Sequence, residues 1–239
     1  MTEYSYESEE SSVMSAADLR RRSVFFAEKL KSDGVSLFPV SSVRKSIATT
    51  FWGQAWNKNI GKYSLFADQL GPGRSYLRNG AVIDLQVSSG LMQAMAVGST
   101  LYDVEVKSTP LSSVQWAGLV EACVGNIATV SDLLAGVLSE QVIAAIVDEN
   151  YGLFPELDQI TFSCTCPDWT DVCKHVAAVL YGFSVRLDQN PALLFQLRGV
   201  DPVDLVTATS LSIIAEIGSE TDASSMDDLE SIFGIDILR

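Results

Sequence analysis

The hydrophobic and polar residues of this 239-residue chain follow two periods, and each period predicts a different kind of secondary structure. Three short segments alternate with a period of two and are separated by Ser-Gly and Gly-Ser turn signals, a pattern typical of an antiparallel meander. The three strands are expected at residues 81–87, 91–97 and 101–107. In the first strand, Ile83, Leu85 and Val87 are the set expected to face the core.

Apolar residues at helical spacing predict helices before and after these strands. Ser15 has the side chain of an N-cap, and the helix that follows it is expected to end near Gly34. A second helix is expected from Thr50, where Phe51 and Trp56 would anchor it in the core. Further helices are expected within 111–150 with breaks near Gly125 and Gly136, over 173–187, from Pro191 and from Pro202.

Other segments are too short or too rich in glycine and polar residues to show either period clearly. Residues 71–80, GPGRSYLRNG, are rich in glycine, which predicts a loop or the entry to a strand. The short run ITFSC at 160–164 predicts one more strand, and residues 217–225 have the composition of a linker. The chain is therefore expected to be of the α+β class, with a small antiparallel sheet and surrounding helices.

Three of the four cysteines and the only histidine fall within twelve residues, as Cys164, Cys166, Cys173 and His175. Thiolates and a neutral imidazole are ligands that Zn²⁺ binds readily, and four of them complete a tetrahedral shell. No coordination position then remains for water or substrate, which predicts a structural zinc site. The apolar run AAVLYGF that follows predicts a helix whose N-terminus carries the second pair of ligands.

Three other interpretations of the cluster compete with zinc. A Cys164–Cys166 disulfide would close too tight a loop for ordinary disulfide geometry. A nucleophilic pair of Cys173 and His175 is conceivable, although catalytic cysteines usually draw their histidine from elsewhere in the fold. An iron or iron–sulfur site is the third alternative. The fourth cysteine, Cys123, lies on an apolar helical stripe and is expected to be a core thiol.

The pattern CxCx6CxH, with CPDW after the second cysteine and CKHVAAVLYG around the third, resembles a SWIM zinc finger. Four further segments resemble bacterial SWIM zinc-finger family proteins: RKSIATTFWGQAWNKNI, GRSYLRNGAVIDLQV, GSTLYDVEV and PALLFQLRGVD. The resemblance implies zinc ligation by the three cysteines and the histidine, and it brings no catalytic residues. It also implies binding of DNA or other proteins, with a Swi/Snf-type helicase-like ATPase as the expected partner.

With this SWIM-type finger embedded in it and leading into a helix, the α+β fold is expected to divide into four parts. These are a disordered acidic N-terminus (1–14), a part with the basic helical segment, meander and helices (15–150), the finger with a helical cap (151–210), and an acidic linker with an amphipathic segment (211–239). Residues 1–14 are expected to be disordered because they are acidic and rich in serine.

The formal net charge of −14 at pH 7 opposes nucleic-acid binding on average, because such binding depends on neutralising phosphates. However, eleven of the sixteen basic residues lie between Arg20 and Arg78, together with only three acidic residues. From Asp201 onward, nine acidic residues are accompanied by Arg239 alone. This asymmetry predicts a basic binding face and an acidic tail, whereas scattered basic residues and a merely solubilising tail are the alternative.

Candidate nucleic-acid contacts come from the glycine-rich segment and from the basic pair that precedes it in the chain. Guanidinium and aromatic groups together suit sequence-tolerant binding of a nucleic-acid strand. The candidates are Arg74, Tyr76, Arg78, Arg44 and Lys45. The alternative is an ordinary turn into the sheet, in which Asn79 and Gly80 supply the turn conformation.

The last segment, DDLESIFGIDILR, is amphipathic and acidic. Its residues Leu229, Ile232 and Phe233 could dock onto a partner protein or a neighbouring subunit, or fold back onto their own domain.

Zinc ligation by His175 would leave no imidazole for general acid–base chemistry near neutral pH, because the chain has no second histidine. We therefore expect a non-catalytic accessory factor that binds DNA, protein or both. The alternatives are an enzyme with a carboxylate-only site and a purely protein-binding scaffold. The acidic N-terminus does not resemble a signal peptide and no apolar run is long enough to span a membrane, so a cytoplasmic location without membrane contact is expected.

Overall fold

A four-stranded antiparallel sheet forms the centre of the computed structural model, which describes residues 14–42, 45–168 and 170–221. The strands lie in chain order and are β1 (Val82–Ser88), β2 (Leu91–Val97), β3 (Leu101–Ser108) and β4 (Ile160–Cys164). The first three form the expected meander, and the expected strand ITFSC pairs with β3 as the fourth. The register places Val104 of β3 opposite Cys164 of β4, so the cysteine cluster lies at the sheet edge that β4 forms.

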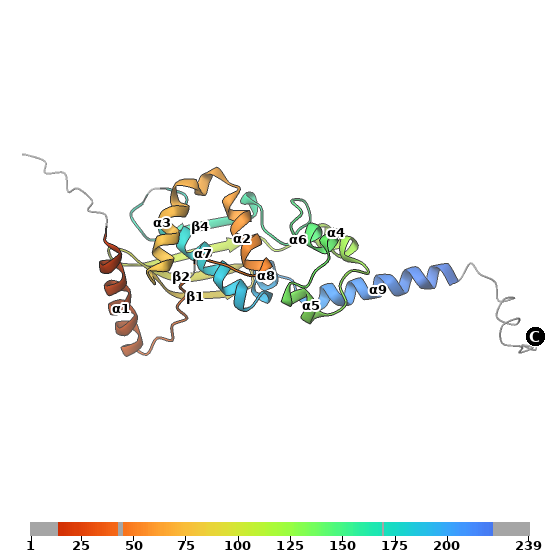
Figure 1. Cartoon of the computed structure of the whole chain (residues 1–239), viewed down its shortest axis with the longest axis horizontal. Coiled ribbons are helices and arrows are strands. Elements are labelled where there is room, and N and C mark those ends of the chain that lie inside the picture. Colours follow the sequence, from red (N-terminus) through yellow and green to blue (C-terminus); the bar gives the residue numbers. More distant parts are fainter. Residues whose placement is uncertain (1–13, 43–44, 169, 222–239) are drawn as a thin grey trace, which may run out of the picture.

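Helices surround this sheet, and the α+β class is confirmed (Figure 1). In the described residues they are α1 (Ala16–Ser32), α2 (Phe51–Gly61), α3 (Ala67–Arg78), α4 (Ser113–Cys123), α5 (Val130–Ala135), α6 (Glu140–Ile146), α7 (Lys174–Gln189), α8 (Ala192–Leu197) and α9 (Pro202–Thr221), with short 3-10 helices η1 (Ser64–Phe66) and η2 (Leu157–Gln159). Ser15 caps α1 by accepting a hydrogen bond from the Asp18 amide, as expected. Breaks at Gly125 and Gly136, both with positive φ, separate α4, α5 and α6.

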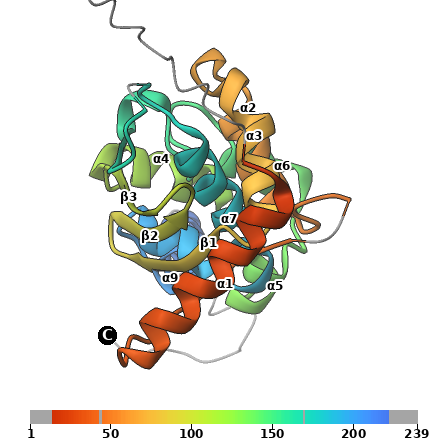
Figure 2. The ribbon, with the colours of Figure 1, turned by 90° about the vertical axis from the view of Figure 1, so that its left-hand side faces the viewer.

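The two faces of the sheet are covered differently. Helix α7 packs against one face and is buried along most of its length between α2, α3 and the strands. Helix α1 covers part of the other face (Figure 2). Leu19 of this helix packs in one cluster with Ile83 and Val97. Helix α9 projects from the end of the molecule opposite α1 (Figure 1). The sheet and α7 together therefore form the frame on which the cysteine cluster is built.

The expectation of a loop at residues 71–80 is wrong, because residues 67–78 form α3. Gly73 is required by packing and not by a turn: a Cβ at this position would collide with Ala177 of α7. The close approach of two helices, invisible to local sequence rules, explains why glycine occurs in the middle of a helix. Only Gly80, with a φ of 73°, has the turn role that was expected of this segment.

The expectation that Ile83, Leu85 and Val87 share one core-facing side is confirmed for Leu85 and Val87, which both pack in the main core, and is wrong for Ile83. Ile83 packs beneath α1, whereas Val82 and Leu85 belong to the main core under α7. An irregularity of the β1–β2 register between Val82 and Asp84 breaks the strict alternation of side chains. Both faces of the first half of β1 are consequently buried.

A buried arginine ties the end of the sheet to α8. The side chain of Arg198 is fully buried and donates hydrogen bonds to Ser108 Oγ at 3.3 Å, to Gln159 Oε1 at 2.9 Å and to the Thr109 carbonyl. Among the described residues it makes no ion pair with a carboxylate. Burial lowers the pKa of Arg198 to about 10, because the charged form is poorly solvated there.

The ends of the described region bear on three further expectations. Helix α9 continues to Thr221, so the expected linker at 217–225 is helical over its first five residues. Residues 1–13 and 222–239 lie outside the described residues, and so does the expected disorder at 1–14, apart from Met14. The main core joins residues on both sides of position 150, and the division into four parts stays a prediction. Within the described region, none of the helices combines the length and apolarity needed to span a bilayer.

Candidate metal centre

The first two cysteines are placed by β4 and the turn that follows it. Cys164 is the last residue of β4, and Thr165 continues the contact with β3 through hydrogen bonds of 3.0 Å with Asp103 in both directions. These bonds extend the strand pairing by one residue and direct the chain toward Cys166. Asp168 then accepts hydrogen bonds from the Thr170 amide and hydroxyl at 3.3 and 3.0 Å, which closes the turn.

The second ligand pair lies at the N-terminus of α7, as expected from the apolar run after it. Cys173 is the N-cap residue with an extended backbone, and His175 is the second residue of the helix. Both side chains are almost completely buried, with exposed fractions of 1% and 2%. The helix dipole and the free amides of the first turn favour negative charge on a sulfur at this position.

The four side chains converge. The three Sγ atoms and a ring nitrogen of His175 all lie within 4.8 Å of one another. His175 Nδ1 is 3.7 Å from Cys173 Sγ and 4.0 Å from Cys164 Sγ. A tetrahedral zinc shell with ordinary bond lengths would separate neighbouring ligand atoms by about 3.5 to 3.8 Å. The cluster is therefore close to the dimensions of such a shell and can hold a metal ion through Nδ1.

The protonation of the thiols also fits a cation. A hydrogen bond from Cys164, followed by one from His175, lowers the pKa of Cys173 to about 3 despite burial. The same sharing of a proton raises the pKa of Cys164, and burial raises that of Cys166. The protein alone thus stabilises one thiolate and disfavours three together. A divalent cation among the sulfurs would supply the missing charge compensation.

Sequence reasoning missed the residues that hold the His175 ring. Tyr102 on β3 and Tyr76 on α3 contact the ring, with centroid distances of 4.7 and 5.3 Å. Gly98, directly after β2, gives the ring its space: a Cβ there would lie 2.6 Å from His175 Nε2 and 2.9 Å from Tyr102. The buried Nε2 atom has no hydrogen-bond partner among the described residues, so on that side of the ring only packing orients it, whereas Nδ1 faces the sulfurs. The only sequence signal was that Gly98 and Tyr102 lie near a strand turn.

The structure divides the candidate nucleic-acid contacts between two places. Arg74 and Arg78 lie near Lys45, whose carbonyl accepts a hydrogen bond of 2.7 Å from Arg78 Nη2. Tyr76 instead lies against His175, half-buried, with Lys174 above its ring. Arg44 lies outside the described residues. The nucleic-acid role of these residues stays a prediction, but Tyr76 is separated from the arginines with which it was grouped.

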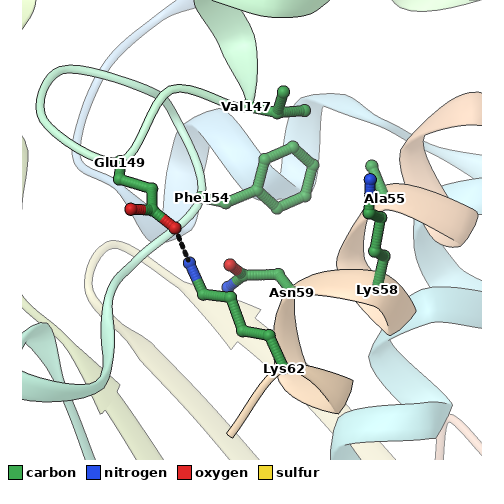
Figure 3. A pocket seen from close by; sticks show the side chains of 7 residues that line it. All are labelled: Ala55, Lys58, Asn59, Lys62, Val147, Glu149 and Phe154. Atoms are coloured by element: carbon green, nitrogen blue, oxygen red, sulfur yellow. Dashed lines mark hydrogen bonds and ion pairs between the residues drawn. The ribbon is translucent and has the colours of Figure 1, made fainter.

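Two further features lie away from the cysteine cluster. A pocket of about 200 Å³ between α2 and the segment after α6 contains Lys58, Lys62 and Phe154 (Figure 3). There Lys62 pairs with Glu149 at 3.5 Å and with Glu156 at 2.6 Å, so its charge is neutralised. The candidate docking residues Leu229, Ile232 and Phe233 lie outside the described residues.

The comparisons with known proteins give one relative and no function. The chain is similar to the uncharacterized protein Rv2102 of Mycobacterium tuberculosis (strain ATCC 25618 / H37Rv), with 31% identity over 168 residues. The similar region covers 69% of this chain and 60% of that protein, so the chain spans less than two thirds of the relative's length. No family model and no solved structure matches the chain. The functional argument therefore depends on the site itself.

Proposed function

We propose that this chain is a zinc-stabilised SWIM-type protein that binds nucleic acid and partner proteins as an accessory factor and catalyses no reaction. The observation that carries this proposal is the convergence of Cys164, Cys166, Cys173 and His175 at the junction of β4 and α7. Four protein ligands complete a tetrahedral shell, which suits a structural role. The resemblance of CxCx6CxH and its flanking residues to a SWIM finger supports the finer assignment.

The roles of the four residues follow from their positions. Cys164 and Cys166 would bind from the end of β4, and Cys173 and His175 from the first turn of α7, so that the metal would join the sheet to its covering helix. Bound zinc would supply the positive charge that keeps three neighbouring thiols ionised. Gly98 and Tyr102 hold the imidazole with Nδ1 toward the sulfurs.

Nucleic-acid binding is supported by the cationic groups along α3 and the segment before α2. Arg74 and Lys45 make no ion pair with a described carboxylate. Helix α1 adds a second set of exposed cations, Arg20, Arg21, Arg22, Lys29 and Lys31. Arg21 pairs with Asp18 at 2.7 Å, and the other exposed cations of α1 are available to phosphates. The partner role, with a Swi/Snf-type helicase-like ATPase docking at Leu229, Ile232 and Phe233, rests on the resemblance and on the amphipathic sequence.

Two measurements on the purified full chain test the proposal. Elemental analysis should find one zinc per chain, and its absence after expression in zinc-containing medium would contradict the metal assignment. Fluorescence anisotropy with a labelled DNA should show affinity that falls steeply between about 50 and 200 mM salt. An affinity that does not change over this range would rule out binding through phosphate contacts.

The partner is tested separately with a purified Swi/Snf-type ATPase from the same source. Co-purification with the wild-type chain is expected, and Phe233→Asp should weaken it because a charge would replace an apolar docking residue. A matched exposed substitution outside the segment, Ser210→Asp, should leave it unchanged. Failure of the wild-type chain to bind the ATPase would remove this part of the proposal and leave the zinc assignment intact.

A further inference from the structure

Helix α1 presents apolar side chains to solvent among its cations. Of its seventeen residues only Leu19 and Ser23 are buried, so the described structure leaves the outer surface of the helix uncovered. Val24 and Phe25 on this surface are 57% and 60% exposed. We call these two neighbouring side chains the α1 patch. An exposed apolar patch with a polar rim is typical of an interaction site.

The rim of the α1 patch is cationic. Arg21, Phe25 and Lys29 follow one another at intervals of four residues and therefore form one row on the helix surface. Lys29 and Lys31 make no ion pair with a described carboxylate, whereas Arg21 pairs with Asp18 at 2.7 Å. Over the whole helix, five cations accompany two carboxylates. A partner for this surface therefore needs both apolar side chains and negative charge.

The chain itself contains a segment of that composition. Residues 222–239, which we call the tail, follow α9 and lie outside the described ranges. The tail carries five carboxylate side chains and one arginine. Ile232 and Phe233 follow Leu229 after three and four residues, a spacing that predicts one apolar face of a helix. The tail thus complements the α1 patch in charge and in apolar character.

The fold places the tail and α1 at opposite ends of the molecule. Helix α1 packs on the sheet near Ile83 and Val97, at one end of β1 and β2. Pro202, the first residue of α9, lines one hollow with Ser89, which follows the other end of β1 about 20 Å away. Helix α9 then points away from α1 and carries Thr221 about 30 Å further (Figure 1).

The tail is too short to bring its apolar residues back to α1 of the same chain. The way back from Thr221 along α9 and β1 measures about 50 Å. Phe233 comes twelve residues after Thr221, and even a fully extended chain of that length reaches only about 40 Å. Contact between the tail and the α1 patch therefore requires two copies of the chain.

We propose that the tail of one copy docks on α1 of a second copy. Its apolar residues, with Phe233 at the centre, cover the patch at Val24 and Phe25, and its carboxylates face the cations around that patch. The contact depends on neither zinc nor nucleic acid. A docked tail occupies the α1 cations and Phe233, which the proposed function assigns to nucleic acid and to a partner protein, so self-association would compete with both.

Analytical ultracentrifugation of the full chain at low salt tests the contact. The wild type at micromolar concentration should sediment as a species larger than the monomer. Phe25→Asp and Phe233→Asp should each weaken self-association by at least about tenfold, because a charge replaces an apolar contact residue. Val114→Asp is the matched control, since it makes a similar change at a side chain of α4 that is 80% exposed and belongs to neither surface. It should associate as the wild type does.

Mixing the two variants identifies the pair of surfaces. Phe25→Asp keeps an intact tail and Phe233→Asp keeps an intact α1 patch, so an equimolar mixture should regain the association that each has lost. A labelled peptide of residues 222–239 should bind the Phe233→Asp chain, whose patch is free, and should not bind Phe25→Asp. Its affinity should fall as the salt concentration rises, because the carboxylates and cations at this surface are exposed.

The outcomes distinguish tail docking from other contacts. A wild type that stays monomeric at low salt and does not bind the peptide would overturn the proposal. Self-association that is lost in Phe25→Asp and kept in Phe233→Asp would indicate pairing of two α1 helices and would overturn it as well. A mixture of the two variants that stays monomeric would exclude the docking of one surface on the other. None of these results bears on the zinc assignment.

Discussion

Replacing Gly98 by alanine tests whether packing around His175 controls the metal centre. The backbone at Gly98 has no positive φ, so alanine is conformationally allowed and only its Cβ matters. That atom would lie 2.6 Å from His175 Nε2 and 2.9 Å from the Tyr102 ring, where ordinary contacts exceed 3.4 Å. One of the rings must therefore move, and the Tyr102 hydroxyl is held by Ser99 at 2.5 Å.

The expected size of the effect follows from this overlap. Forcing one extra carbon into a packed site costs about 1 to 3 kcal/mol. The strain is largest when the imidazole occupies the ligating position, so release of the metal relieves it and the metal affinity should fall by about ten- to hundredfold. The melting temperature of the metal-loaded chain should fall by about 2 to 4 °C for each kcal/mol.

The assay is a competitive titration with a chromophoric zinc chelator at pH 7, together with a thermal melt. Gly61→Ala serves as the control, because a Cβ there meets no atom within 4 Å and the residue lies at the end of a helix. It should leave zinc affinity unchanged and raise stability by up to about 1 kcal/mol. Unchanged zinc affinity and melting temperature in Gly98→Ala would refute the reasoning.

Three other predictions concern the metal and two buried groups. Cys173→Ser should lose the metal and unfold at a lower temperature, and a chelator should have the same effect on the wild type, because structural zinc contributes to the free energy of folding. Unchanged melting temperatures in both experiments would contradict this prediction. Arg198→Lys should cost about 1 to 3 kcal/mol in urea unfolding, since lysine cannot reproduce the forked bonds to Ser108 and Gln159, and a smaller loss would argue against that role. Burial raises the pKa of Cys123 to about 11, above the value of an unfolded thiol, so its contribution to stability is complete below about pH 8.5 and is lost between there and pH 11. The loss of stability over that window should be smaller in Cys123→Ala, and equal slopes would count against an ionisable buried thiol.

The features that depend on short stretches of chain could be predicted from the sequence. The period-two strands, the Ser15 cap and the breaks at Gly125 and Gly136 depend on rules that act within a few residues. The Cys₃His cluster could also be predicted from the sequence, because all four candidate ligands lie within twelve residues and their side chains are of the types that bind zinc. Such signals need no knowledge of what lies across the fold.

The features that failed depend on contacts between distant segments. The local sequence at Gly71, Pro72 and Gly73 predicts a turn. In the structure the segment is helical, and Gly73 allows it to pack closely on Ala177. In β1, the register is irregular between Val82 and Asp84, and α1 buries part of the face of the sheet that α7 does not cover. The alternation of apolar and polar residues therefore did not predict which side chains are buried. Arg198 would be placed on the surface by its residue type, yet three hydrogen bonds allow it to be fully buried.

The placement of α3 connects the Cys₃His cluster with the side chain of Arg74. The two faces of this helix contact two residues of α7: Tyr76 packs on His175, and Arg74 stacks on Tyr181. The spacing between the helices is set by Gly73, where a Cβ would force them apart. A metal bound at the N-terminus of α7 would fix that helix against β4, and with it the position of Tyr181 under the Arg74 guanidinium. The Cys₃His centre can thus influence how the Arg74 guanidinium is held without contacting it, because the helix pair α3 and α7 carries both.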